Sequence, residues 1–172
     1  MKKTLKILND LEREGIIKSY ALGGAIALLF YAEPALTYDL DVFIFLTEVE
    51  GKTGTLIDLG PLYQALEKKG YKSKKEHVII EGIPVQFIPA YNALVEEGVK
   101  KAMKKEYQGI PTKVVRIEHL LAIMLNTNRL KDRERIGRLL EEGLEIDQKK
   151  FSQVLSRHGL KEKWEKAIGK VK

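Results

Sequence analysis

The sequence has no cysteine among its 172 residues, which excludes disulfide bonds and thiolate metal sites. It also lacks a long apolar run, because the longest one, residues 20–32, is too short to cross a bilayer. The basic N-terminus has no apolar segment of the secretory kind, since Lys6, Asn9 and Asp10 interrupt it. We therefore expect a cytoplasmic protein with no membrane span.

The chain carries no strong excess of one charge. Lys and Arg number 30 against 24 Asp and Glu, so the formal net charge is +6. A modest positive charge can attract nucleic acid or nucleotides. The clustered lysines around residues 70 and 102 lack the repeated aromatic rings of a single-strand binding surface. A solubilising surface is therefore the first interpretation, and RNA binding is the second.

Hydrophobic periodicity predicts helices alternating with strands in the first two thirds of the chain and helices alone thereafter. The expected helices are residues 2–14, 25–32, 61–69, 91–103, 118–127, 131–142, 147–158 and 160–171. The expected strands are residues 16–22, 40–46, 74–80 and 83–88, with Glu81-Gly82 as a hairpin turn. Residues 107–117 are expected to form a polar extended stretch.

This order of elements predicts an α+β fold with an α/β-type core. The core would be a mixed sheet flanked by helices over residues 1–112, followed by a C-terminal helical region, residues 113–172, packed on it. The apolar fraction of 44% is sufficient for such a core.

Two aspartates stand at the start of the most apolar strand pattern. Asp39 and Asp41 are two residues apart, so in a strand their carboxylates project from the same face, about 7 Å apart along the backbone. Like charges so placed repel, and a divalent cation such as Mg²⁺ relieves the repulsion. The alternative is that Asp39 ends a loop and Asp41 is a solvated residue at the strand start.

A glycine pair precedes the aspartates. Gly23 and Gly24 lie where a strand pattern gives way to a helix pattern, a place where helix N-terminal amides can hold a phosphate. The connection over residues 33–38 is long enough to return Asp39 beside the glycines. A tight turn required for packing is the alternative role of the pair.

The string "GGAIALLF…TYDLDVFIF" resembles the signature of the DNA polymerase β-like nucleotidyltransferase superfamily, particularly its small AbiEii-like members, which include toxins of toxin–antitoxin systems. A second string, "VVRIEHLLAIMLNTNRLKDRERIGRLLE", is similar to their C-terminal pattern, in which a helix is followed by Arg-x-Lys-Asp and another helix. Both motifs in this order are more specific than either alone.

The resemblance implies a fold and a reaction. The fold would be a nucleotidyltransferase-like mixed sheet, and the reaction would transfer a nucleoside monophosphate from an NTP to a hydroxyl of an RNA, such as tRNA, a protein or a small molecule. The metal ligands would be Asp39 and Asp41, holding Mg²⁺ or Mn²⁺. The nucleotide-binding residues implied are Gly23, Gly24, Thr37, Arg129 and Lys131. Asp132 completes the second motif, although Arg129, Lys131 and Asp132 would also suit surface ion pairs.

The sequence departs from the family pattern at the third carboxylate, which active members carry on a neighbouring strand. The matching position is Gln86, whose amide oxygen can coordinate a metal but supplies no charge and no base. If Glu81-Gly82 is the hairpin turn, His77 lies opposite Gln86 and is a candidate substitute base or ligand. Met124 stands where many members have a lysine.

Two functions therefore remain open at this point. One is an Mg²⁺-dependent nucleotidyltransferase with a catalytic set of Asp39, Asp41 and Gln86. The other is a degenerate member that binds nucleotide, RNA or a protein partner without turnover. A module without a ligand site, in which the aspartates only begin a strand, leaves the pairing of both motifs to coincidence.

Overall fold

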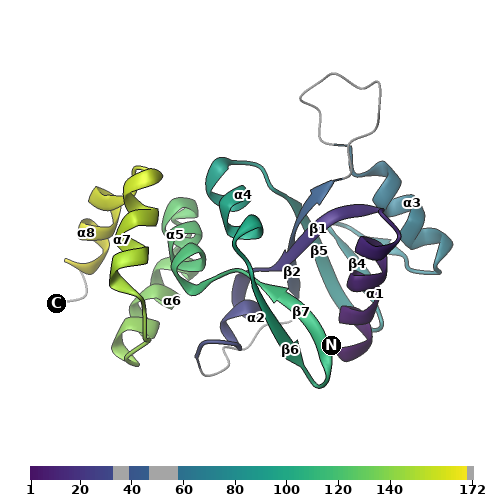
Figure 1. Ribbon diagram of the computed structural model, residues 1–172, viewed down its shortest axis with the longest axis horizontal. Helices are drawn as coiled ribbons and strands as arrows, with labels where there is room; N and C mark the ends of the chain where they lie inside the picture. The colour runs from purple at the N-terminus through teal and green to yellow at the C-terminus, as the bar shows by residue number, and fades with distance from the viewer. Residues whose placement is uncertain (33–38, 47–57, 170–172) are drawn as a thin grey trace.

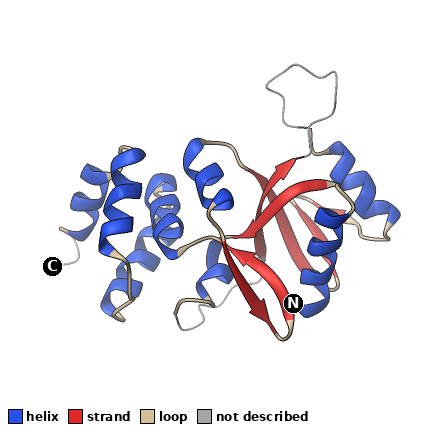
Figure 2. Ribbon diagram, in the orientation of Figure 1, coloured by secondary structure: helices blue, strands red, loops and turns tan. Residues whose placement is uncertain are grey.

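The computed structural model describes residues 1–32, 39–46 and 58–169, which form one seven-stranded sheet and eight helices (Figures 1 and 2). The strands are β1 (Ile17–Leu22), β2 (Leu40–Leu46), β3 (Ser73–Lys74), β4 (His77–Ile80), β5 (Ile83–Pro89), β6 (Met103–Tyr107) and β7 (Ile110–Val114). The helices are α1 (Lys2–Arg13), α2 (Gly24–Leu28), α3 (Gly60–Lys68), α4 (Ala93–Lys100), α5 (Ile117–Thr127), α6 (Leu130–Glu141), α7 (Gln148–Arg157) and α8 (Lys161–Ile168). In these ranges no helix has the length and apolar character needed to span a membrane.

The sheet is mixed, with strand order β3-β4-β5-β2-β1-β7-β6. Its centre is β2, which pairs in parallel with β5 on one side and antiparallel with β1 on the other. The predicted α+β class with a mixed sheet and flanking helices is confirmed. Helices α5 to α8 gather beyond one end of the sheet, and α1 and α3 lie near its other end (Figure 1).

One face of the central strands packs on α1. Val42 and Ile44 pair across the sheet with Leu22 and Tyr20, and all four side chains are buried. The Tyr20 hydroxyl donates to Asn9 Oδ1 of α1 at 2.6 Å. This face is the apolar underside of the sheet, because alternate residues of a strand point to opposite sides.

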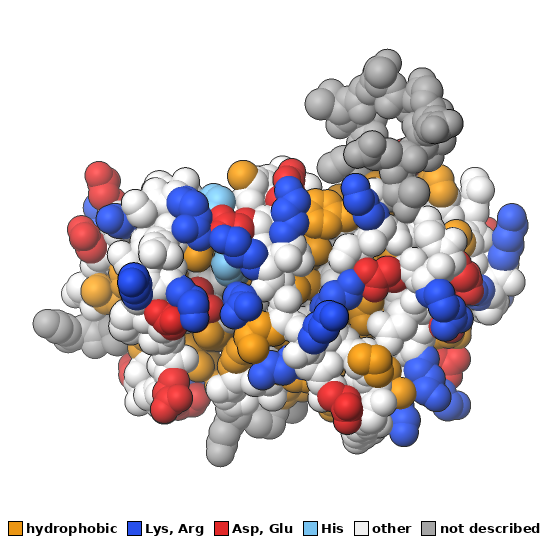
Figure 3. Space-filling model, in the orientation of Figure 1, with side chains coloured by type: hydrophobic (Ala, Val, Ile, Leu, Met, Phe, Trp, Pro, Cys, Tyr) orange, Lys and Arg blue, Asp and Glu red, His pale blue; other side chains and the backbone are white. Residues whose placement is uncertain are grey.

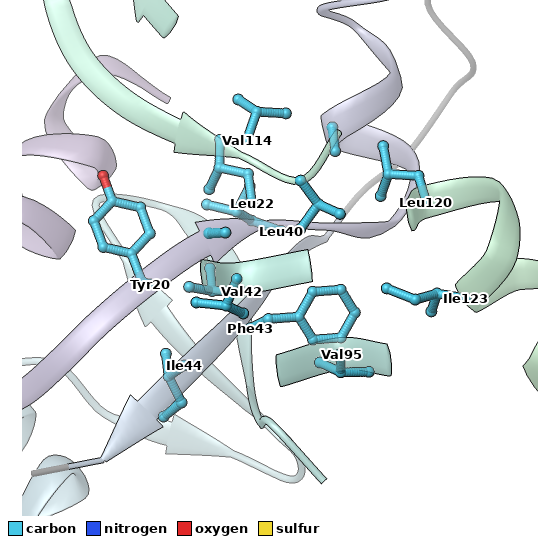
Figure 4. Close-up of a cluster of buried hydrophobic side chains, with 14 of the residues drawn as sticks. Tyr20, Leu22, Leu40, Val42, Phe43, Ile44, Val95, Val114, Leu120 and Ile123 are labelled. Atoms are coloured by element: carbon cyan, nitrogen blue, oxygen red, sulfur yellow. The ribbon is translucent and has the colours of Figure 1, made fainter. Parts of the chain in front are cut away.

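The other face of β2 carries Asp41 and Phe43. The Phe43 ring lies beside Val95 of α4 and near Ile123 of α5 (Figure 4). Phe43 is only 5% exposed, so this face is also closed by helices along most of its length. Asp41 stands at the end of the strand that these helices leave uncovered, which is where the cleft described below begins.

Two local predictions were wrong. The helix expected over residues 91–103 ends at Lys100, and Met103 begins β6, whose hairpin with β7 pairs in parallel with β1 through Val114 and Leu22. The polar pattern of this hairpin suits its place at the sheet edge, where one face meets water. The strand expected over residues 74–80 is interrupted, because Lys75 has φ +57° in the turn between β3 and β4.

The boundary expected between residues 112 and 113 lies within β7, and the helices that follow begin at Ile117. Whether the two regions are separate domains stays a prediction.

A cluster of ion pairs around Glu97, the Glu97 cluster, joins α4 to the C-terminal helices. Glu97 of α4 pairs with Lys101 at 2.7 Å, with His158 Nε2 at 2.7 Å and with Arg157 at the end of α7, and it lies 3.4 Å from His119 Nε2 of α5. Its side chain is only 15% exposed. Burial opposes ionisation, but the hydrogen bonds from these partners outweigh it and hold the pKa of Glu97 far below its ordinary value.

Replacing Glu97 by glutamine should lower the free energy of unfolding by about 2 kcal/mol at neutral pH, because the cations around it lose their counter-charge. The folded-state pKa of Glu97 is depressed, so its stabilisation is complete above the unfolded pKa of about 4.3 and is lost as pH falls further. Chemical denaturation of both proteins between pH 3 and 8 measures this difference.

Glu96→Gln is the matched control, since Glu96 is exposed and pairs with the exposed Lys100, and it should change stability by less than about 0.5 kcal/mol. Equal effects of the two substitutions would contradict the role given to Glu97.

Candidate functional site

The acidic wall of the cleft comes from two neighbouring strands. Asp39 precedes β2 and Asp41 is its second residue, and Gln86 of β5 is the direct parallel neighbour of Asp41. All three side chains line one cleft of about 290 Å³. The structure therefore brings Gln86 to the same cleft as the two aspartates, and its role as the third position of the site stays a prediction.

The opposite wall comes from the α5–α6 junction. Arg129, Lys131 and Arg135 bring three cations to the same cleft. Arg129 caps α6 and donates from Nε to Asp132 Oδ2 at 2.6 Å, and Thr127 Oγ1 donates to the same oxygen at 2.8 Å. Asp132 is 1% exposed, so it is a buried anchor for Arg129 and not a solvated ion pair.

The two walls act on each other electrostatically. Burial raises the pKa of Asp41, and the neighbouring charge of Asp39 raises it further, whereas Arg129, Lys131 and His77 lower it. The hydrogen bond with Asp132 raises the pKa of Arg129. Two carboxylates held together at a partly buried position are costly, so the cleft favours a ligand that brings positive charge to the acidic wall.

Gly24 makes room for Asp41. A Cβ atom at Gly24 would lie 2.0 Å from Asp41 Oδ2, and the residue has φ +55°, a conformation that glycine adopts without strain. Gly23 is constrained differently, since a Cβ there would meet the Phe43 ring at 2.3 Å and its amide donates to the Asp41 carbonyl at 2.9 Å. Packing therefore explains why glycine occupies both positions. Binding of phosphate by either glycine stays a prediction.

Three predicted residues, Gly23, Thr37 and His77, do not appear in the described walls of the cleft, whereas Gly24 does. Thr37 is outside the described residues. His77 is in the predicted register, since Ile80 pairs with Ile83 and Val78 with Val85, but it is not among the described residues that line the cleft. Its Nε2 lies 3.7 Å from Asp39 Oδ2, so it contacts the acidic wall from outside.

Sequence reasoning missed Arg135 and Tyr91. Arg135 Nη1 lies 3.9 Å from Asp132 Oδ1, three residues along α6, and this helical spacing could have identified it. Tyr91 follows the strand that carries Gln86 and lines the cleft. No motif marked it, because its position depends on how the turn between β5 and α4 meets α5.

The donor atoms of the acidic wall suit a hard cation. Two carboxylates and one amide supply oxygen ligands, and Mg²⁺ commonly takes one or two protein carboxylates while keeping water and phosphate oxygens. No cluster of three or more His, Cys, Asp or Glu side chains able to hold a metal occurs in the part of the chain that the structure describes. The site therefore fits a metal whose coordination a substrate completes.

No family model matches the sequence, and no curated protein matches it. The fold does have solved relatives. An antigenic nucleotidyltransferase-like protein from Paracoccidioides brasiliensis aligns over 98% of this chain and 93% of its own, with 14% identity and a TM-score of 0.54. A candidate nucleotidyltransferase from Thermotoga maritima aligns over 80% and 91%, with 15% identity and a TM-score of 0.47. The antibiotic-resistance factor ANT(2'')-Ia aligns over 96% and 88%, with 14% identity and a TM-score of 0.44.

The Paracoccidioides structure shows that the chain has the nucleotidyltransferase fold. The predicted nucleotidyltransferase-like fold is thereby confirmed, and membership of the superfamily stays a prediction. The closer likeness to AbiEii-like proteins stays a prediction.

Gly24→Ala should displace the Asp41 carboxylate and cost roughly 1–2 kcal/mol of stability, because the new Cβ meets Asp41 and the positive φ strains an L-residue. Gly159→Ala is the matched control, with φ +63° and no atom within 4 Å of the place that its new methyl group would take. Denaturation should show the strain of the positive φ in both variants and a further loss of stability from the contact with Asp41 in Gly24→Ala alone. Equal losses in the two variants would contradict the close approach.

Proposed function

We propose that the protein is a nucleotidyltransferase that uses Mg²⁺, or Mn²⁺, to transfer a nucleoside monophosphate from an NTP to a hydroxyl group. The observation that carries this proposal is the opposition of Asp39 and Asp41 to Arg129 and Lys131 across one cleft in a nucleotidyltransferase fold. Neither wall alone would distinguish the site from a surface ion pair.

The charges of the cleft match a metal-bound triphosphate. The charge of the buried Asp132 carboxylate is matched by Arg129, whose side chain is 56% exposed and reaches the cleft. Asp39 and Asp41 suit a cation at the acidic wall, and Lys131 and Arg135 suit phosphate oxygens at the basic one. A ligand that carries both a divalent cation and several phosphate charges satisfies both walls at once.

The chain's residues have distinct roles in the proposed reaction. A bound metal would neutralise charge on the triphosphate and activate the phosphoryl centre. Asp39 and Asp41 would hold it, and Arg129, fixed by Asp132, would orient the phosphates. The acceptor hydroxyl oxygen forms a bond to the α-phosphorus. The bond between the α-phosphorus and the oxygen that bridges it to the β-phosphorus breaks, and pyrophosphate leaves.

Gln86 supports a second candidate function. The acceptor hydroxyl must lose a proton, and an amide cannot take it. Asp39, Asp41, water or His77, 3.7 Å from Asp39, would have to do so. A protein without an adequate base would bind nucleotide, RNA or a partner and not turn over, so degeneracy is the alternative that Gln86 favours.

The acceptor is proposed as the hydroxyl of an RNA, a protein or a small molecule. Lys and Arg side chains are distributed over the face drawn in Figure 3 among acidic and apolar ones, which suits an anionic acceptor such as tRNA without forming one continuous track. Since the reaction consumes NTP, we place it in the cytoplasm. Kinship with AbiEii-like toxins and a toxin–antitoxin role belong to this proposal.

Calorimetric titration of wild type with each NTP in the presence of Mg²⁺ should show metal-dependent binding. Asp39→Asn/Asp41→Asn should weaken it at least about tenfold, or roughly 1.4 kcal/mol, because the acidic wall loses its charge. Glu162→Gln/Glu165→Gln removes the same charge from exposed positions on α8 and should bind as wild type. Absence of binding at millimolar NTP would refute both candidate functions.

Turnover separates the two candidates. Wild type incubated with labelled NTP and cell extract should label an RNA or protein band if the enzyme proposal holds, and Gln86→Asp should increase the labelling by restoring a base beside Asp41. Gln86→Asn is the control, because it retains an amide. Labelling by Gln86→Asp and none by wild type would instead identify a degenerate protein.

A further inference from the structure

The cleft has an apolar half that the proposed chemistry leaves unused. Its apolar lining residues are Phe43, Ile88, Tyr91, Leu120, Ile123 and Met124. Phe43, Leu120, Ile123 and Met124 are at most 7% exposed, whereas Tyr91 is 50% exposed. Among the described residues, the other large apolar side chains with marked exposure are Leu130 and Ile168, which do not line this cleft. Tyr91 is therefore a half-exposed aromatic residue in the lining of the cleft.

The backbone on both sides of Tyr91 is fixed. The Ala90 amide donates to the Ile44 carbonyl at 3.0 Å, which ties the end of β5 to β2. The Asn92 side chain caps α4 and accepts from the Val95 amide at 2.9 Å. An exposed ring held between two fixed neighbours is pre-organised, so a ligand that packs on it does not have to order the backbone first.

Residue order along β5 shows where Tyr91 lies relative to the acidic wall. Gln86 is opposite Asp41, Ile88 is opposite Phe43, and Tyr91 comes after the strand ends. The cleft thus runs from the carboxylates at one end to the aromatic ring at the other. Arg129 lines the same cleft as Asp41 and Tyr91.

We propose that Tyr91 is the platform on which the nucleobase of the bound NTP stacks. This inference rests on the proposed function, since it takes the triphosphate to lie between the acidic wall and Arg129. Every base has a π face, and the side chains of Ile88 and Met124, which line the same cleft, carry no group that reads a base edge by strong hydrogen bonding. Tyr91 therefore contributes affinity for all four NTPs and little discrimination among them.

The test compares NTPs with inorganic tripolyphosphate, which has the phosphates and no base. With Mg²⁺ present, calorimetry on wild type should show binding of both, and tighter binding of each NTP. Tyr91→Ala should weaken binding of all four NTPs by about five- to a hundredfold and leave tripolyphosphate unchanged. Tyr91→Phe keeps the ring and should bind NTPs within about twofold of wild type. Ile168→Ala removes an exposed apolar side chain on α8 and should bind as wild type.

The outcomes separate this inference from the proposed function. Unchanged NTP affinity in Tyr91→Ala, or an equal loss for NTP and tripolyphosphate, overturns the stacking role and leaves the proposed function standing. A loss confined to one base also overturns it, because stacking alone does not select a base. If wild type binds neither NTP nor tripolyphosphate, the proposed function fails and the inference fails with it.

Discussion

The like charges of Asp39, which precedes β2, and Asp41, its second residue, are the constraint on which the cleft depends. Burial and the neighbouring carboxylate both raise the pKa of Asp41, so the ionised form of Asp41 destabilises the folded protein locally. Gly24 lacks the Cβ that would collide with Asp41 Oδ2, and Arg129 and Lys131 supply opposing charge from another element. A fold that tolerates this arrangement is suited to a cation at the acidic wall.

The basic wall is useful only if the helical region is held against the sheet. The Glu97 cluster joins α4, which packs on β2, to α5 and to the end of α7. Helix α5 leads directly into Arg129 and α6, where buried Asp132 fixes the guanidinium. The contacts of Glu97 and of Asp132 thus link the helical region to the cations of the cleft. We expect the geometry of the site and the stability of the helical region to be coupled.

Several features of the fold and site could be predicted because their signals are local. The D-x-D pattern, the glycine pair and the Arg-x-Lys-Asp string each lie within a few residues, whereas the position of Gln86 is identified from the family pattern and the structure pairs it with Asp41. The turn at Glu81-Gly82 determines the register of β4 and β5. The place of the β6–β7 hairpin in the sheet and the place of Tyr91 depend on contacts between distant segments, such as the pairing of Val114 with Leu22, which no local pattern encodes.

The most direct test of the central claim is the location of a metal in crystals grown with Mn²⁺ and a non-hydrolysable NTP analogue. The anomalous signal of Mn²⁺ should lie between the carboxylates of Asp39 and Asp41, with the triphosphate extending from it toward Arg129 and Lys131. Mn²⁺ bound elsewhere, or a triphosphate bound without contact to the acidic wall, would contradict the account.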